Sequence, residues 1–351
     1  AAGWPCALMT LVARRLADVP GGQLGWPGGA WGAASLAAVT AVVVLAGPSA
    51  LRRARRRPWV TAACAALVAA LLVPVLGARP SWPPAGWVAV ACDVGQGDAL
   101  VLRGEQGRTV LVDAGPSPDD VDACLSRLGV TTLDAVVLTH FHADHVDGLP
   151  GVLDGRRVGA VLVTITDDPP EGAAAVRSWA AQAGVPVRAT RAGERVELGD
   201  LAFDVLWPER VLQDGSVPNN ASIVMDVQVA GVRLLLTGDI EPAAARVIAQ
   251  RARLRDPAVD VLKVAHHGSA KQDPALVAAL SPALALISVG ADNHYGHPAP
   301  STTRLLDDVG ARIARTDLSG DLAVVREPDG VRLVTSGPRR HSATRSTGGG
   351  D

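Results

Sequence analysis

The stretch "LTHFHADHVDGL" (Leu138–Leu149) decides how the rest of the sequence is interpreted. It places three of the chain's 8 histidines, and one aspartate, within six residues directly after an apolar run. His140 and His142 are two residues apart on a predicted extended loop, so both imidazoles point the same way. Asp144 and His145 are displaced from them, toward a second possible position for a metal ion. Imidazole and carboxylate together suit zinc, manganese or iron, and the stretch therefore predicts a metal site.

Other histidines and two carboxylates also follow closely on apolar runs that predict strands. Loops that leave the C-terminal ends of strands are where α/β proteins place active sites. Each aspartate taken alone would be expected to cap a helix or shape a turn. Because such residues recur at several strand ends, we expect a shared metal site at the rim of a sheet. The residues are Asp113, Asp239, His266, His267, His294 and His297, of which His294 is expected at the surface.

The region after Ala85 predicts an α/β domain. Nine apolar runs, from "WVAVACDV" (Trp87–Val94) to "PALALISVG" (Pro282–Gly290), are typical of β-strands. They alternate with helical patterns, and hairpins between some of them favour mixed sheets. We place this domain at residues 86–336 and expect the polar, Gly-rich tail, 337–351, to be disordered. The predicted helices are Asp119–Leu128, Gly172–Ala183, Pro242–Arg253, Pro274–Leu280 and Ser301–Val309.

Residues 1–85 predict a membrane region. Two charge-free spans, Ala30–Ala50 and Pro58–Ala78, are each long enough to cross a bilayer as a helix. Five arginines lie in the short loop between them, and short basic loops stay cytoplasmic. The pattern predicts a multi-pass protein of the cell membrane whose large domain is extracytoplasmic. Cys6–Val19 predicts an amphipathic helix at the membrane surface, and we expect an upstream part of the same protein to precede the chain.

The four cysteines, Cys6, Cys64, Cys92 and Cys124, show no CxxC spacing. We interpret them as small buried apolar residues. A Cys92–Cys124 disulfide in an oxidising compartment is the alternative.

The motifs carry a family resemblance. "THFHADHVDG" matches the HxHxDH signature of the metallo-β-lactamase fold, and Asp113, Asp239 and His266 follow that superfamily's motif order. More narrowly, "DVGQGDA", "PNNASIV", "LKVAHHGS" and "YGHPAP" resemble the C-terminal hydrolase domain of the ComEC-type DNA-uptake channel. The resemblance covers roughly Trp87 to Thr335. It implies an α/β fold, a metallo-β-lactamase-like αββα sandwich, here preceded by a two-helix transmembrane hairpin.

The resemblance also implies a ligand set for one or two divalent cations. Zinc is the expected metal and manganese is the alternative. The implied ligands are His140, His142, Asp144, His145, Asp239 and His266. The first two would bind one cation and the others a second, with Asp239 bridging. His267 stays the alternative to His266, because spacing cannot separate adjacent histidines. Asp113 would orient the loop histidines without binding metal itself.

One motif departs from many metallo-β-lactamase-fold hydrolases. Those enzymes place a third histidine for the first metal just before the strand that precedes the bridging aspartate. In this sequence the position is occupied by Asn219-Asn220-Ala221-Ser222. The first site is then weaker, or its third ligand is Asn220, water or substrate.

Other polar residues of these motifs are expected to contact the metal ligands or the substrate. Asp144, Asp239 and His297 are the expected catalytic residues, with His297 placed to protonate a leaving group. The supporting residues are Asp93, Gln96, Asp98, Asn220, Ser222, His267 and Ser269.

The resemblance implies metal-dependent hydrolysis of DNA phosphodiesters in a channel for natural transformation. The expected partners are single-stranded DNA, the membrane and the rest of the channel. Residues 86–351 carry 25 basic and 34 acidic side chains, which favours only weak contact with a polyanion. One alternative is a non-catalytic module that guides DNA. Another is a membrane-tethered hydrolase of a lipid or nucleotide phosphodiester.

Overall fold

The structure, a computed structural model, describes residues 82–250 and 258–338, with a few single residues between 34 and 59. The chain divides into two compact units, Ala1–Pro80 and Ser81–Asp351. The predicted membrane spans and the tail lie almost entirely outside the described residues. No helix within the described ranges has both the length and the apolar character needed to cross a bilayer.

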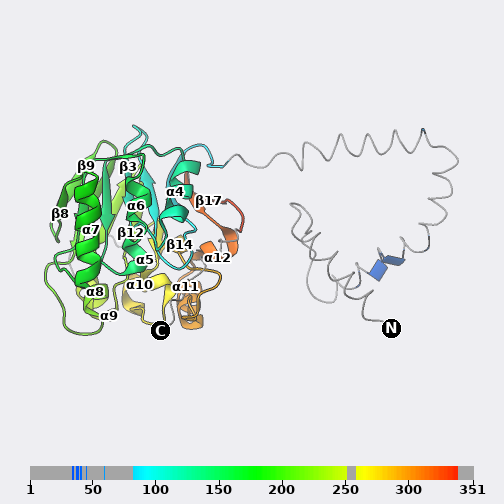
Figure 1. Ribbon diagram of the computed structural model, residues 1–351. Coiled ribbons are helices and arrows are strands. Elements are labelled where there is room, and N and C mark those ends of the chain that lie inside the picture. Colours follow the sequence, from blue (N-terminus) through cyan, green and yellow to red (C-terminus); the bar gives the residue numbers. More distant parts are fainter. Residues whose placement is uncertain are drawn as a thin grey trace, which may run out of the picture. The chain divides into compact units, whose positions relative to one another are not determined.

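The Ser81–Asp351 unit is an α/β fold built on two mixed sheets (Figure 1). The 8-stranded sheet has the order β17-β16-β1-β2-β3-β5-β7-β8. Its parallel part runs from β3 to β8, and its antiparallel part is closed by the C-terminal hairpin, β16–β17. The strands are β1 (Trp87–Ala91), β2 (Leu100–Arg103), β3 (Thr109–Val112), β5 (Ala135–Leu138), β7 (Val161–Val163), β8 (Val187–Ala189), β16 (Leu322–Glu327) and β17 (Gly330–Thr335).

The second sheet has 7 strands in the order β15-β14-β13-β12-β11-β10-β9. Strands β12 to β15 are parallel, and β9 to β12 form an antiparallel meander. The strands are β9 (Arg195–Leu198), β10 (Leu201–Trp207), β11 (Val224–Val229), β12 (Val232–Leu236), β13 (Val261–Lys263), β14 (Leu284–Ile287) and β15 (Arg312–Arg315). A separate short parallel pair is β4 (Thr132–Leu133) with β6 (Arg157–Val158).

Helices cover the outer face of each sheet, and the two sheets bury their other faces against one another. One core, containing Val110, Phe203 and Leu234, joins the two sheets. A second core lies between the first sheet and α4, α6 and α7, and a third lies between the second sheet and α9, α10 and α11. The layers are therefore helix, sheet, sheet, helix, as the resemblance implied. The helices are α4 (Pro118–Arg127), α5 (Ala143–Val146), α6 (Leu149–Leu153), α7 (Pro170–Gln182), α8 (Val217–Asn220), α9 (Pro242–Ala249), α10 (Pro274–Leu280), α11 (Pro300–Asp308) and α12 (Thr316–Ser319), with a 3₁₀ turn, η2 (Ala265–Gly268).

Helix α4 shows how local sequence sets these elements. Ser117 caps its N-terminus by accepting a hydrogen bond from the Asp120 N–H at 3.4 Å. Pro118 occupies the first turn, where no N–H is needed, and two aspartates there suit the helix dipole. Val121 and Leu125, one turn apart, are buried against the first sheet.

A disulfide joins Cys92, just after β1, to Cys124 in α4. Our interpretation of these two cysteines as unlinked apolar residues was therefore wrong, and the alternative bridge is present. Both are fully buried, so the bond fastens α4 to the sheet within the first core. Cys6 and Cys64 lie outside the described residues.

Removing the disulfide should lower the free energy of unfolding. The bridge spans a sequence separation of 32 residues. Closing a loop of that size restricts the unfolded chain, so the Cys92→Ala/Cys124→Ala variant should lose about 2–4 kcal/mol in urea denaturation. Reduced wild-type chain should unfold near the same urea concentration as the variant. A variant that unfolds with the oxidised wild type would contradict a stabilising role.

Candidate metal centre

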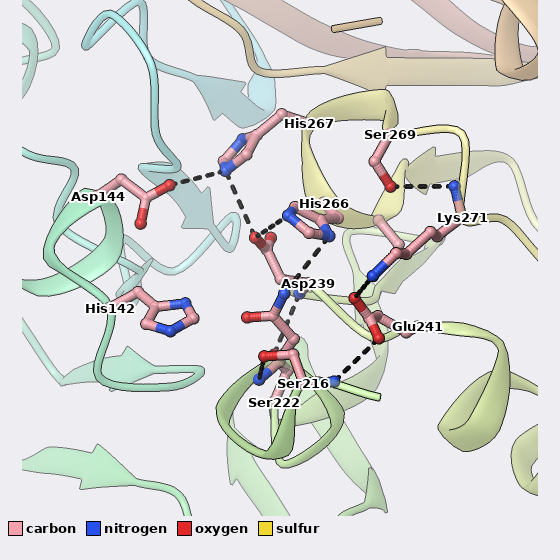
Figure 2. A network of polar contacts seen from close by, with 12 residues as sticks. His142, Asp144, Ser216, Ser222, Asp239, Glu241, His266, His267, Ser269 and Lys271 are labelled. Atoms are coloured by element: carbon pink, nitrogen blue, oxygen red, sulfur yellow. Dashed lines mark hydrogen bonds and ion pairs between the residues drawn. The ribbon is translucent and has the colours of Figure 1, made fainter. Parts of the chain in front are cut away.

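Parallel strands from both sheets deliver the predicted site residues to one edge of the sandwich. Asp113 follows β3 and the "HFHADH" loop follows β5, two adjacent parallel strands of the first sheet. Asp239 follows β12, and His266 and His267 follow β13, which are adjacent parallel strands of the second sheet. Figure 2 shows side chains from both sheets converging on Asp239.

Four residues form a compact set, which we call the central group: Asp144, His145, Asp239 and His267. Their ligand atoms all lie within 4.8 Å of one another. The His267 Nε2 atom is 3.1 Å from Asp144 Oδ2 and 3.5 Å from Asp239 Oδ2. The His145 Nε2 atom is 3.4 Å from Asp239 Oδ2. Two imidazoles and two carboxylates at such distances are a donor set suited to a divalent metal ion.

Unpaired buried atoms in the central group support a metal rather than a hydrogen-bond network. His145 Nε2 and Asp239 Oδ1 are buried and have no hydrogen-bond partner in the described part of the chain. A buried polar atom without a partner is costly, and a bound cation would satisfy both. The residues therefore fit a divalent cation.

The charges around His267 also favour a bound cation. Burial disfavours its charged form, but the carboxylates of Asp239 and Asp98 outweigh burial and raise the pKa of His267 to about 10. Burial also opposes ionisation of Asp144, yet the charges of His145 and His267 lower the pKa of its carboxyl to about 2. Ionised carboxylates here create a field that favours positive charge, whether a proton or a metal ion supplies it.

The structure brings His267, and not His266, into the central group. Both residues have φ of 51°, so two consecutive left-handed residues turn the rings in different directions. The His267 side chain is 2% exposed, whereas that of His266 is 24% exposed with its Nε2 3.9 Å from Asp239 Oδ2. Our ligand prediction named His266, and this geometry favours its alternative.

His140 and His142 form a second donor pair beside the central group. The His140 Nε2 and His142 Nδ1 atoms are 3.0 Å apart. His140 is fully buried, with its Nδ1 3.2 Å from Thr139 Oγ1 and 3.3 Å from Ser222 Oγ. Its ring lies 4.1 Å from that of His145, between centroids. The pair therefore lies directly beside the central group.

The asparagines of the "PNNAS" motif have separate roles. The Asn220 Oδ1 accepts hydrogen bonds from the Glu241 and Ala244 N–H groups, and its Nδ2 donates to the Asp214 carbonyl. Asn220 therefore ties two loops together and is not placed as a ligand. Asn219 instead faces the site: its Nδ2 is 3.4 Å from His266 Nδ1, and its buried Oδ1 has no partner among the described residues.

Asp113 contacts the Nδ1 side of His145. Its carboxylate lies 2.9 Å from His145 Nδ1 and accepts hydrogen bonds from the Thr139 N–H and hydroxyl. This leaves the His145 Nε2 atom facing Asp239. Ser222 supports the other side, because its hydroxyl accepts a hydrogen bond from the Asp239 N–H at 3.1 Å.

The "DVGQGDA" loop reaches the site through Gln96 and Asp98 but not Asp93. Gln96 lines the cavity over the central group, and Asp98 lies beneath it with its Oδ1 3.4 Å from His267 Nδ1. A Cβ at Gly97 would lie 2.3 Å from the Asp144 carbonyl oxygen, so glycine permits this approach. Asp93 is buried elsewhere, with its N–H bonded to Asp321.

Lys263, which was not among the predicted site residues, pairs with Asp98 beneath the central group. Its Nζ is 2.7 Å from Asp98 Oδ2, and both side chains are 4% exposed. Burial raises the pKa of Asp98, but the charges of Lys263 and His267 outweigh it and lower it. The pair therefore keeps Asp98 ionised against the Nδ1 side of His267.

An open cavity of about 500 Å³ lies over these residues. His297 lines it, and burial together with the charge of His266 lowers the pKa of this imidazole. Ser269 is not in the lining; its hydroxyl accepts a hydrogen bond from the Lys271 N–H (Figure 2). The lining residues are Gln96, His142, Ala143, Asp144, Asn219, Asp239, His266, His267, Tyr295 and His297.

Comparison with known proteins identifies the family. Residues 92–290 match the model of the metallo-beta-lactamase superfamily. The chain belongs to this superfamily. It is 29% identical over 253 residues to ComE operon protein 3 of Bacillus subtilis, covering 66% of this chain and 32% of that protein. It is 28% identical over 275 residues to Competence protein ComA of Neisseria gonorrhoeae, covering 76% and 35%.

These two matches confirm the resemblance to ComEC-type proteins. The chain spans about a third of the length of each of these two relatives. Among solved structures, the metallo-beta-lactamase fold protein YhfI from Bacillus subtilis aligns with 65% of this chain and 95% of its own. That alignment has a TM-score of 0.44 and 13% sequence identity.

Proposed function

We propose that the chain hydrolyses phosphodiester bonds in single-stranded DNA with a divalent cation, zinc or manganese. In this proposal it is the hydrolase part of a membrane protein for DNA uptake in natural transformation. The observation that carries the proposal is the central group, with its two unpartnered buried atoms, beneath a cavity large enough for a nucleotide. The relatives named as competence proteins supply the DNA-uptake context.

In the proposal the central group would hold one cation, and His140 and His142, together with Asp239, would hold a second. Asn219, in place of the predicted Asn220, is the proposed amide ligand, because its Oδ1 atom has no hydrogen-bond partner among the described residues and it lines the cavity. A bound divalent cation supplies a Lewis acid that lowers the pKa of water and stabilises charge on phosphate.

The chain's own residues position and exchange protons around the substrate. Asp113 orients the ring of His145 and the Ser288 carbonyl orients the ring of His267, each through the Nδ1 atom, and Asp98 adds negative charge beside His267. Asp144, whose side chain is 34% exposed, presents its carboxylate to the cavity. We assign His297, on the cavity wall, to protonate the leaving oxygen.

The disulfide and the sequence relatives support an extracytoplasmic location for the domain in this proposal. Disulfides persist in oxidising surroundings, so the Cys92–Cys124 bond favours an extracytoplasmic domain. The competence relatives favour a multi-pass protein of the cell membrane, with the rest of the channel and an upstream part of the same protein as partners.

Asn219 and Asn220 support a second candidate, a module that guides DNA without cutting it. An amide oxygen is a weaker zinc ligand than imidazole, so the site at His140 and His142 would retain its cation poorly. This candidate predicts metal bound only by the central group and no hydrolysis.

DNA cleavage by the 351-residue chain tests the proposal. With Mn²⁺ or Zn²⁺, the chain should cut a labelled single strand, and Asp144→Ala should lower the rate at least about 100-fold. Asp147→Ala, in the same loop but exposed and outside the cavity lining, should cleave as wild type. Equal cleavage by Asp144→Ala, or no cleavage with either metal, would refute hydrolysis of DNA. Cleavage of only a lipid or nucleotide phosphodiester would redirect the substrate.

A further inference from the structure

Tyr295 is the one tyrosine of the chain, and it stands at the mouth of the cavity over the central group. It belongs to the loop between β14 and α11, and 75% of the residue is exposed. Every tryptophan and phenylalanine within residues 82–250 and 258–338 is buried or half-buried. An exposed aromatic ring beside a candidate active site therefore requires an explanation beyond packing.

The loop holds this ring in a defined place. Asn293 Oδ1 accepts a hydrogen bond from the His297 N–H at 3.1 Å, and Asn293 Nδ2 donates to the carbonyls of Gly290 and His297. The Tyr295 ring stacks on His297 with centroids 5.9 Å apart and planes 28° from parallel. His297 in turn lies 5.6 Å from the His266 ring. A row of rings thus leads from the surface to the central group.

The charge of the cavity explains why such a ring matters. Its lining contains two carboxylates, Asp144 and Asp239, and neither lysine nor arginine. Proteins that bind DNA usually gain affinity from basic side chains on phosphates, and this lining offers none. Stacking of bases on aromatic side chains is the other main source of affinity for single strands, and it tolerates any sequence.

We propose that Tyr295 is the stacking platform for an unpaired nucleobase next to the phosphate that enters the central group. The inference rests on the proposed function and deepens it. Since bases of a duplex are stacked on their own neighbours, only a single-stranded or frayed nucleotide can use this platform. Tyr295 therefore determines specificity for single-stranded over double-stranded DNA.

Binding of a hydrolysis-resistant oligonucleotide tests this inference separately from catalysis. The probe is a single strand with hydrolysis-resistant phosphorothioate linkages, which keep the negative charge of the phosphate, and one 2-aminopurine, whose fluorescence falls when it stacks. With the 351-residue chain and Mn²⁺, Tyr295→Leu should raise the Kd about tenfold or more and abolish the quenching. Tyr295→Phe should stay within about twofold of wild type, because it keeps the ring.

Two controls separate stacking from other causes. Leu318→Ala, at an exposed apolar residue outside the cavity lining, should bind as wild type. An abasic version of the probe should bind wild type and Tyr295→Leu equally. Wild-type affinity in Tyr295→Leu, an equal loss on the abasic probe, or no binding by wild type would overturn the inference. Quenched binding without any DNA cleavage would sustain the platform and refute the nuclease.

Discussion

Replacing His267 with alanine should remove most of the bound metal, whereas replacing His266 should leave it bound. His267 Nε2 faces both carboxylates of the central group, at 3.1 Å from Asp144 and 3.5 Å from Asp239. Loss of a residue that supports a metal ligand lowers metal affinity or activity by roughly 10–100-fold. Loss of a ligand itself should therefore lower the affinity by at least about 100-fold. Calorimetric titration with Zn²⁺ and metal analysis after dialysis would measure the affinity.

The two variants control for one another. Both histidines have φ of 51°, so alanine meets the same left-handed backbone cost at each position. His266→Ala should weaken metal binding by less than about tenfold, because His266 lines the cavity and its Nε2 atom, 3.9 Å from Asp239 Oδ2, lies farther from the central group than that of His267. A larger loss of metal in His266→Ala than in His267→Ala would restore the ligand assignment implied by the family motif.

This pair also shows where sequence reasoning reaches its limit. Strand-end patterns placed Asp113, Asp239 and the "HFHADH" loop at one edge, because carboxyl ends of parallel strands meet there. Adjacent histidines cannot be separated in that way, since the direction of each ring depends on a backbone φ that no spacing encodes. The roles of Asn219 and Asn220 were hidden for the same reason.

For the helices and strands as well, local patterns were predictable and long-range pairing was not. Predicted helix Pro274–Leu280 has those bounds in α10, and each of the nine predicted strand runs contains a strand. The C-terminal hairpin, β16–β17, was missed, although Asp329-Gly330 between two apolar runs is a typical hairpin signal. Its pairing with β1, more than 200 residues away, is a tertiary choice that local sequence does not reveal.

Lys263 was missed because it lies within an apolar strand run, but a lysine there carries information. Lysine is rarely buried unless it is paired, so its presence predicts a buried acid nearby. The structure supplies Asp98, whose Oδ2 lies 2.7 Å from the Nζ atom, while Asp98 Oδ1 faces His267. Removing one partner of such a pair leaves an uncompensated buried charge, which costs several kcal/mol.

Lys263→Met should therefore lower the free energy of unfolding by about 3–5 kcal/mol in urea denaturation. Lys271→Met is the matched control, because Lys271 is the only other lysine and its side chain is 63% exposed beside Glu241. That variant should lose no more than about 1 kcal/mol.

Replacing both buried partners, Asp98→Leu/Lys263→Met, should recover much of the lost stability, since no isolated charge remains. The double variant should still bind Zn²⁺ more weakly than wild type, because the negative charge of Asp98 no longer lies beside His267, whose Nδ1 atom keeps only its contact with the Ser288 carbonyl. Equal unfolding free energies for Lys263→Met and Lys271→Met would show that the buried pair does not stabilise the domain.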